Sequence, residues 1–313
     1  MFTEEQRTDL SFTGISSFAK WSVCSDLDRV DADIAILGLP YDQSTQWRTG
    51  CRFGPRAIRD SSTQYALGPN GYYDPERDRI FLGNKWRYVD CGDVEMLHGS
   101  QEVCHENIRS AVRRLLMRDV LPVFLGGDHS VTAPVIEAFS GGDELTVIQL
   151  DAHLDFVDHR GGNRYGNGSP LRRAAECDHV KGIHHLGMRG PGSSGHDEFR
   201  LTKEMGNTVF GLRDIRRMGT EAVLEGLPEN SDFYVTIDCD VLDPSIAPGC
   251  ASPSPGGMYY HEIQDILESI SRRGHVVGFD FVEVSPPYDV SSMTSQLAAR
   301  LCLDFIGYIL EQE

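Results

Sequence analysis

Short apolar runs alternate with amphipathic stretches along most of this chain. The runs are too continuous for a sheet that has one face in water, and they are typical of strands buried on both faces, as in parallel sheets. We predict strands within residues 33–39, 87–94, 121–127, 145–153, 184–190, 233–240 and 276–284.

Apolar positions recur at helical spacing between several of these runs. In residues 101–118 they include Ile108, Val112 and Leu115, the pattern of an amphipathic helix. Pro55 suits the first turn of another helix. Further helices are predicted at residues 130–139, 259–273 and 294–311. Because strand and helix alternate, we predict the α/β class: a single three-layer α-β-α domain with a mainly parallel central sheet.

The length of 313 residues permits two domains, but the chain shows no internal repeat, low-complexity segment or linker. We therefore predict one catalytic domain over residues 31–313. Residues 1–30 are polar and irregular, and they are predicted to form an N-terminal extension. Its segment TGISSFAKW is apolar enough to dock on the body of the protein.

The net charge limits the classes of partner that we expect, and the cysteines indicate the cellular compartment. Counting 29 Lys and Arg against 47 Asp and Glu gives a net charge of −18, which argues against nucleic acid or an anionic membrane as a partner. The eight cysteines form no CxxC pair and no zinc-finger spacing, as expected for reduced thiols. With no signal-like segment and no apolar run near the roughly 20 residues of a membrane span, we predict a cytoplasmic protein.

Acidic residues and histidines gather where the apolar runs end. In open parallel sheets, ligands bind outside the carboxyl ends of the strands, so these residues are the candidates for chemistry. They are Asp128 and His129 after the run at 121–127, Asp151, His153 and Asp155 after LTVIQL, Asp238 and Asp240 after FYVTI, and Glu283 after VVGFDF.

The spacing of these side chains predicts a metal site. In an extended segment, residues two apart point to one side, so the ligands of DAHLD (151–155) and those of DCD (238–240) each converge. With His129 they supply four carboxylates and two imidazoles, a set that suits Mn, Fe, Ni or Zn. One such cluster alone is as consistent with a solvated polar loop. Burying all three without a cation would be costly, and six ligands suit two ions better than one.

Several segments, in this order, resemble the ureohydrolase superfamily of arginases, agmatinases and related guanidino hydrolases. The segments are RTGCRFGPRAIR (48–59), GGDHS (126–130), DAHLD (151–155), YVTIDCDVLDPSIAPG (234–249) and GFDFVEVSPPYD (278–289). The N-terminal TGISSF and the run GSPLRRA make the chain most similar to agmatinase-like members. The resemblance implies an arginase-like fold, a small guanidino substrate, release of urea, and a homo-oligomer, either a trimer or a hexamer.

The resemblance also implies ligands and roles. One ion would be held by His129, Asp151, Asp155 and Asp238, and the other by His153, Asp151, Asp238 and Asp240. The family usually holds two Mn²⁺ ions per subunit, and some members use Ni²⁺. A water-derived hydroxide would attack the guanidinium carbon. Asp155 would pass a proton to the leaving amine, and Glu283 would hold the guanidinium N–H groups.

One position departs from the agmatinase-like pattern. Asn167, in YGNGSPLRRA, stands where such members usually have a histidine. Asparagine cannot titrate near neutral pH, so we expect Asn167 to orient substrate or water rather than to shuttle protons. Trp47 is a candidate wall of the substrate pocket. Arg164 is a candidate for binding a substrate carboxylate, as are Arg48 and Arg189.

Agmatine is the substrate that the resemblance suggests first. The change at Asn167 favours a guanidino substrate with a different group at its far end. A guanidino acid, guanidine itself or an alkylguanidine remains open at this point. So does hydrolysis of a formimino group, which releases no urea. A catalytically silent subunit of a mixed oligomer is the alternative from a different class, and the complete ligand set argues against it.

Overall fold

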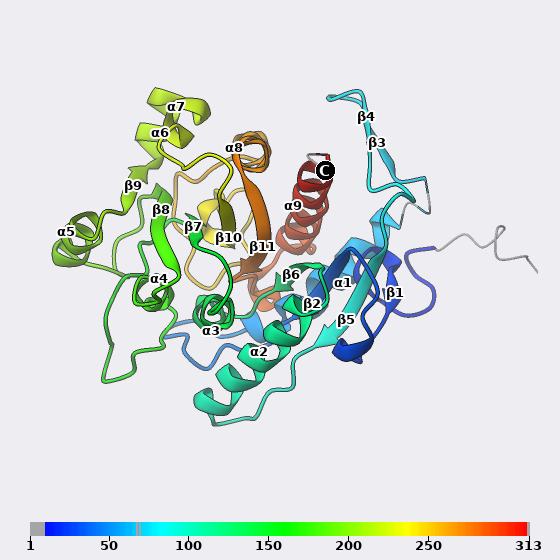
Figure 1. The fold of residues 1–313 in the computed structure, drawn as a ribbon, viewed down its shortest axis with the longest axis horizontal. Helices are drawn as coiled ribbons and strands as arrows, with labels where there is room; N and C mark the ends of the chain where they lie inside the picture. Colours follow the sequence, from blue (N-terminus) through cyan, green and yellow to red (C-terminus); the bar gives the residue numbers. More distant parts are fainter. Residues whose placement is uncertain (1–9, 67, 69, 312–313) are drawn as a thin grey trace, which may run out of the picture.

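Nine parallel strands form the central sheet of the computed structural model, which describes residues 10–66, 68 and 70–311 (Figure 1). This sheet confirms the predicted fold class. In spatial order the strands are β1 (Ser22–Val23), β5 (Tyr88–Asp93), β2 (Ile34–Gly38), β6 (Leu121–Leu125), β11 (His275–Val282), β10 (Asp232–Asp238), β7 (Leu145–Leu150), β8 (Val180–Met188) and β9 (Thr208–Gly211).

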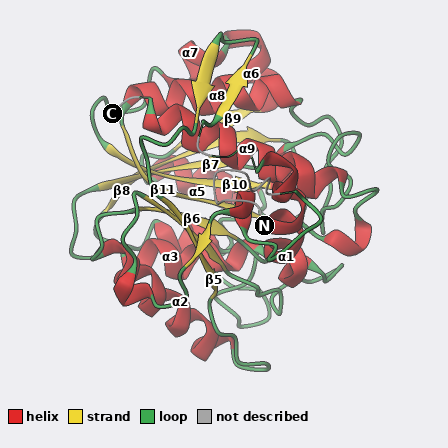
Figure 2. Ribbon diagram, turned by 90° about the vertical axis from the view of Figure 1, so that its right-hand side faces the viewer, coloured by secondary structure: helices red, strands yellow, loops and turns green. Residues whose placement is uncertain are grey.

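Helices cover both faces of this sheet. One face carries α1 (Gly54–Ser62), α6 (Leu212–Met218), α7 (Thr220–Leu224), α8 (Tyr260–Arg273) and α9 (Met293–Leu310). The other carries α2 (Gln101–Leu116), α3 (Thr132–Ala138), α4 (Pro170–Ala174) and α5 (His196–Glu204). Figure 2 shows the strands fanning out between α2 and α3 on one side and α8 on the other. A separate antiparallel hairpin is formed by β3 (Tyr72–Asp74) and β4 (Arg79–Phe81).

The two cores follow from the alternation of side chains within each strand. In β2, Ile34 and Ile36 join one hydrophobic core, while Ala35 and Leu37 join the other. Because successive side chains point to opposite faces, a strand buried on both sides is apolar at most of its positions. The continuous apolar runs therefore predicted all the inner strands, although β8 begins at Val180, four residues before the predicted start at 184.

The N-terminal segment packs against the sheet. Phe18 is fully buried, and its backbone N–H donates to Asp90 Oδ2 at 2.7 Å. β1 pairs with β5 at the edge of the sheet. Part of the predicted N-terminal extension, residues 1–30, therefore contributes a strand to the main sheet. Among the described residues, no helix has both the length and the apolar character needed to cross a membrane.

The order of the strands places the candidate site residues at one edge of the sheet. β6, β11, β10 and β7 are neighbours in the middle of the sheet, and all four run in the same direction. The loops that follow them therefore leave from one edge, side by side. These loops carry the acidic and imidazole residues on which the predicted chemistry depends.

Candidate metal centre

Four of the predicted ligands surround one point at the carboxyl edge of the sheet. His129 Nδ1 lies 3.2 Å from Asp151 Oδ2, 3.0 Å from Asp155 Oδ2 and 3.3 Å from Asp238 Oδ2. Ligand atoms of all four residues fall within 4.8 Å of one another, and all four side chains are buried. These are the residues that we predicted to hold one of the two ions.

A second group adjoins the first and shares Asp151 with it. His153 Nδ1 lies 2.7 Å from Asp240 Oδ2 and 3.8 Å from Asp151 Oδ1. Asp151 thus turns one carboxylate oxygen toward each histidine, which is the geometry of a bridging ligand. Asp238 is not part of the second group, so its predicted bridging role remains a prediction.

The ligands converge by a different route from the predicted one. β7 ends at Leu150, and the segment after it is not extended: Asp155 has a left-handed backbone, with φ of 50°. Asp240 lies in the short 3₁₀ helix Cys239–Val241. The expectation that residues two apart would point to one side of an extended strand was therefore wrong.

Asx turns bring the ligands together instead. At each of three strand ends an aspartate carboxylate accepts the backbone N–H of the residue two positions on, which turns the chain. The three pairs are Asp128 with Ser130, Asp151 with His153, and Asp238 with Asp240.

The surroundings of His129 show that this pocket fits a cation. The Thr236 hydroxyl donates to Asp280 Oδ1 at 2.6 Å, so its oxygen accepts the Nε2–H of His129 at 3.0 Å. Nδ1 then faces three carboxylates. Burial lowers the pKa of His129, but hydrogen bonds to Asp151, Asp155 and Asp238 outweigh it and raise that pKa well above its ordinary value. The position beside Nδ1 therefore attracts positive charge, either a proton or a metal ion. Carboxylates that face one another at this distance are stabilised only by positive charge between them.

The carboxylates resist ionisation without such a charge. Burial, together with the charges of Asp240 and Asp155, raises the pKa of Asp151 to about 8. Burial and the charges of Asp240 and Asp151 raise the pKa of Asp238 well above its ordinary value. Divalent cations reverse this effect, because they favour the ionised carboxylate. The mixed oxygen and nitrogen donors fit a first-row transition metal better than Ca²⁺ or Mg²⁺.

A chain of hydrogen bonds that the sequence did not reveal ends on Asp151. Gln149 Nε2 donates to Asp151 Oδ2 at 2.6 Å, so Gln149 Oε1 is left to accept the Nδ1–H of His185. His185 Nε2 then accepts the hydroxyl of Thr202, which itself accepts from Asn207. Every donor points toward the carboxylate. The chain therefore fixes the orientation of Asp151, and the burial of His185, which lowers its pKa to about 3, keeps that ring neutral.

A cavity of about 200 Å³ opens onto the metal ligands. Glu283, Asn167 and Trp47 line it, so these three predicted residues lie where a substrate would bind. Glu283 is held by its neighbours: Oε1 accepts the backbone N–H of His129 at 2.9 Å, and Oε2 accepts the Cys51 thiol at 3.2 Å. The cavity lining also includes Arg160, Gln46 and Ser193, which sequence reasoning did not select.

Glu283 and Asp155 adopt left-handed backbone conformations, with φ of 64° and 50°. Such strain costs about 1–3 kcal/mol per residue and persists only where the surroundings enforce it. The backbone N–H of Glu283 donates to Gly127 O, and that of Asp155 donates to Ser193 Oγ. Gly127 is required here because a Cβ would lie 1.8 Å from the carbonyl oxygen of Tyr41.

The prediction that Arg164 binds substrate is not supported by its position. Arg164 is absent from the cavity lining, and its guanidinium is held at the surface by Glu176 and Asp158. Arg189 is tied to the backbone carbonyls of Asp240 and Ser254. Arg48 packs on the rings of Trp47 and Tyr288. None of the three arginines named in advance lines the cavity among the described residues.

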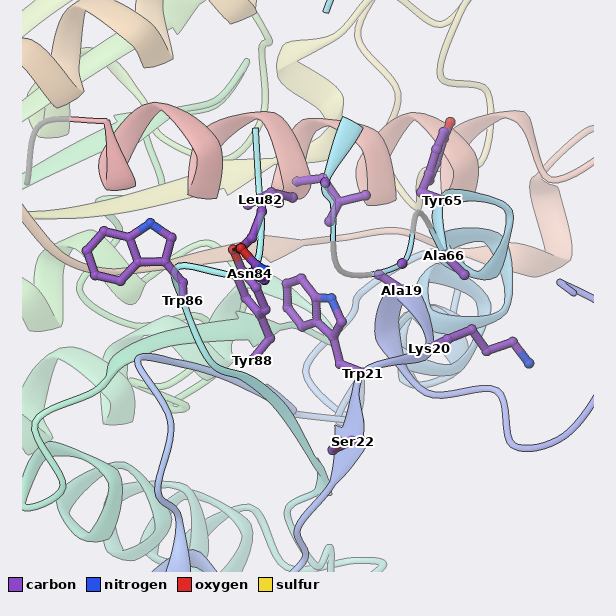
Figure 3. Close-up of a pocket in the computed structure, with 14 residues that line it drawn as sticks. Ala19, Lys20, Trp21, Ser22, Tyr65, Ala66, Leu82, Asn84, Trp86 and Tyr88 are labelled. Atoms are coloured by element: carbon purple, nitrogen blue, oxygen red, sulfur yellow. Dashed lines mark hydrogen bonds between the residues drawn. The ribbon is translucent and has the colours of Figure 1, made fainter. Parts of the chain in front are cut away.

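A separate cavity of about 360 Å³ lies between the N-terminal segment and the β3–β4 hairpin (Figure 3). Its lining includes Trp21, Tyr65, Trp86 and Tyr88, and Trp21 stacks on Tyr88. None of the candidate metal ligands or substrate residues borders it, so it is distinct from the chemical site.

The sheet and the buried cluster define the class: an α/β protein with a carboxylate and imidazole site suited to metal ions. Comparisons with known proteins agree. The model of the arginase family matches residues 32–307. An agmatinase of Bacillus cereus is 31% identical over 280 residues, covering 88% of this chain and 91% of its own. The mitochondrial guanidino acid hydrolase of Homo sapiens is 30% identical over 300 residues, covering 94% and 82%.

A solved structure is similar over the whole fold. The proclavaminate amidino hydrolase from Streptomyces clavuligerus superimposes with a TM-score of 0.87 at 28% identity, covering 97% of this chain and 99% of its own. The chain belongs to the arginase family. This assignment confirms the predicted resemblance and places the chain among hydrolases of amidino carbon–nitrogen bonds.

Metal binding should stabilise the protein measurably. At 100 times its Kd, each ion adds about 2.7 kcal/mol, and at this chain length about 1 kcal/mol moves Tm by about 1.5 °C. Adding Mn²⁺ or Ni²⁺ to metal-stripped protein should therefore raise Tm by about 4 °C per ion. Asp151→Asn should lose this shift, with less than one ion per chain by mass spectrometry. Glu229→Gln, at an exposed position, should keep it. Full metal content in Asp151→Asn would contradict the ligand assignment.

Gln149→Leu should weaken metal binding about 10- to 100-fold, because Asp151 loses the donor that orients it. His185→Phe should have a smaller effect, since Gln149 can still donate to Asp151. Calorimetric metal titration gives the Kd values, and Gln64→Leu, an exposed position, is the control. Unchanged affinity in a folded Gln149→Leu variant would show that the hydrogen-bond chain serves packing alone.

Proposed function

We propose that the protein is a dinuclear metal-dependent hydrolase that cleaves a guanidino carbon–nitrogen bond and releases urea. One observation carries the proposal: Asp155 and Asp238 of the buried His129 cluster border the same cavity as Glu283, so a candidate metal site and a carboxylate for a guanidinium face one substrate. The agmatinase and guanidino acid hydrolase among the relatives support the same reaction class.

The residues fit two ions, which we propose to be Mn²⁺, with Ni²⁺ as the alternative. His129, Asp151, Asp155 and Asp238 would hold one ion, and His153, Asp240 and Asp151 would hold the other, with Asp238 as a predicted second bridge. When bound, such a pair supplies a water made nucleophilic at neutral pH and stabilises the negative charge of the transition state.

The chain's own residues orient the substrate and move the protons. Glu283 accepts N–H groups of the guanidinium by charge-assisted hydrogen bonds, which holds the planar group across the cavity. Water adds to the guanidinium carbon, and the bond from that carbon to the substituted nitrogen breaks. Asp155, held by Ser193, would take a proton from the attacking water and pass it to the leaving nitrogen, so that urea and an alkylammonium are the products.

Asn167 lines the same cavity and donates and accepts hydrogen bonds without titrating. We propose that it orients the substrate or the attacking water. We further propose a cytoplasmic homo-oligomer, a trimer or a hexamer. The eight free cysteines, six of them buried, are consistent with a reducing compartment.

Urea release tests the proposal directly. Protein loaded with Mn²⁺ or Ni²⁺ is assayed for urea and ammonia with agmatine, arginine, guanidinopropionate, guanidinobutyrate, guanidine and methylguanidines. We expect urea from at least one compound, and loss of turnover by more than 10³-fold in Asp151→Asn. Absence of urea from all of them in metal-replete protein would overturn the proposed reaction. Ammonia without urea would favour formimino hydrolysis.

Asn167→His should test what this position contributes. A titratable imidazole would add a proton carrier to the cavity wall, and we expect it to raise turnover of agmatine relative to the best substrate. The pH profile of kcat should gain a dependence near the pKa of histidine, about 6.5. Asn163→His, in the same exposed loop, is the control. Identical substrate preference and pH profile would show that Asn167 does not determine substrate choice.

A further inference from the structure

Arg160 is the one basic side chain among the described residues that line the cavity, apart from the metal-site imidazole of His153. The acidic residues of the lining are Asp155, Asp238, Asp240 and Glu283, and each already has a place at the metal centre or at the guanidinium. No carboxylate of the described lining is left to bind a second cationic group. A substrate with a charged group at its far end would therefore place that charge near Arg160.

A tight turn fixes the position of Arg160. Arg160 and Asn163 exchange backbone hydrogen bonds of 3.0 and 3.1 Å around Gly161 and Gly162. Both glycines have left-handed φ values, 59° and 85°, as a two-residue hairpin turn of this hand requires. Arg160 and Asn167, the position that departs from the agmatinase-like pattern, both line the cavity.

The guanidinium of Arg160 joins three loops at the cavity mouth. Nη1 donates to Gln46 Oε1 at 2.5 Å, and Nη2 donates to the carbonyl oxygens of Gly192 and Ser193 at 2.9 and 3.1 Å. Ser193 in turn accepts the backbone N–H of Asp155, so Arg160 is one residue removed from a metal ligand. Three of its five N–H groups are used, and two have no acceptor among the described residues.

The neighbouring acid does not neutralise this charge. Asp158, two residues before Arg160, is bound to Arg164 and Arg173 and does not line the cavity. Arg160 interacts with neutral carbonyl and amide oxygens only, so its full positive charge faces the mouth. An arginine held in this way, with two N–H groups available, is suited to a carboxylate.

We infer that the substrate is a short guanidino carboxylic acid, and that Arg160 binds the carboxylate at its far end. The inference rests on the proposed function, and it selects one of the tails that the sequence left open. The cavity of about 200 Å³ limits the length of the chain between the two charged groups. Agmatine, which ends in an ammonium group, would place that charge against Arg160.

Kinetics and binding with paired substrates test this inference. We expect kcat/KM for 3-guanidinopropionate or 4-guanidinobutyrate to exceed that for agmatine at least tenfold. Arg160→Gln should raise KM for the acid about 10- to 100-fold, with little change in kcat, because one charge-assisted contact is lost. Arg160→Lys should recover part of the loss, and Arg160→Glu should shift preference toward agmatine. Arg200→Gln, an exposed arginine on α5, is the matched control.

A purely structural role for Arg160 gives a different result. If it only clamps the three loops, Arg160→Gln will lower kcat/KM equally for acids, agmatine and guanidine, and Arg160→Glu will not favour agmatine. Either outcome overturns the inference. A wild-type preference for agmatine overturns it too, while the proposed urea-releasing reaction stands.

Calorimetry keeps the two proposals separable. If the metal-loaded protein turns over no guanidino compound, binding of 4-guanidinobutyrate still reports on Arg160. We expect wild-type protein to bind it at least tenfold more tightly than agmatine, and Arg160→Gln to lose that difference. Equal binding of the two compounds by the wild type would refute the carboxylate site whatever the reaction proves to be.

Discussion

Crowded carboxylates out of contact with water are the constraint on which this structure depends. Asp151, Asp155 and Asp238 turn oxygens toward Nδ1 of His129, and the sheet edge buries all of them. Desolvated negative groups in contact destabilise a fold unless positive charge lies among them. Metal binding and folding stability are therefore linked here: the arrangement that makes the site costly without ions is what gives it affinity for them.

Hydrogen bonds from neighbouring residues hold the crowded carboxylates and His129 in place. Asp280 accepts hydrogen bonds from Tyr234, Thr132 and Thr236, and through Thr236 it sets the tautomer of His129. On the other side, Gln149 aims a donor at Asp151. Apart from Thr132, which begins α3, the residues that support His129 and Asp151 lie on strands in the centre of the sheet, where neighbouring strands restrict movement. Rigid strands thus support ligands that themselves sit on turns and strained loops.

The sequence predicted the features that are encoded within a single strand and the residues directly after it. Continuous apolar runs located the inner strands, and the acidic residues and histidines after them located the six candidate ligands and Glu283, which the structure gathers at one edge of the sheet. Gln149 was overlooked although it interrupts the run LTVIQL, because only the paired strand β8 shows that it meets His185. Arg160 could not be separated from Arg164, since both lie in one polar loop and only the turn at Gly161 decides which side chain faces the cavity. α5 to α7 and β9 lie at the sheet edge, where partial exposure removes the continuous apolar signal.

Electrostatics reconcile a strongly acidic protein with the anionic substrate tail that we infer. The net charge of −18 acts over distances at which salt screens it, since the Debye length is about 8 Å at physiological ionic strength. Within the cavity, charged groups lie closer together than this length, so the individual charges there determine which substrate binds. Two divalent ions would offset most of the charge of the five carboxylates at the site, and Arg160 offsets the remainder. A guanidino acid carries one charge of each sign, a guanidinium for Glu283 and a carboxylate for Arg160, whereas a dication would bring a second positive charge to Arg160.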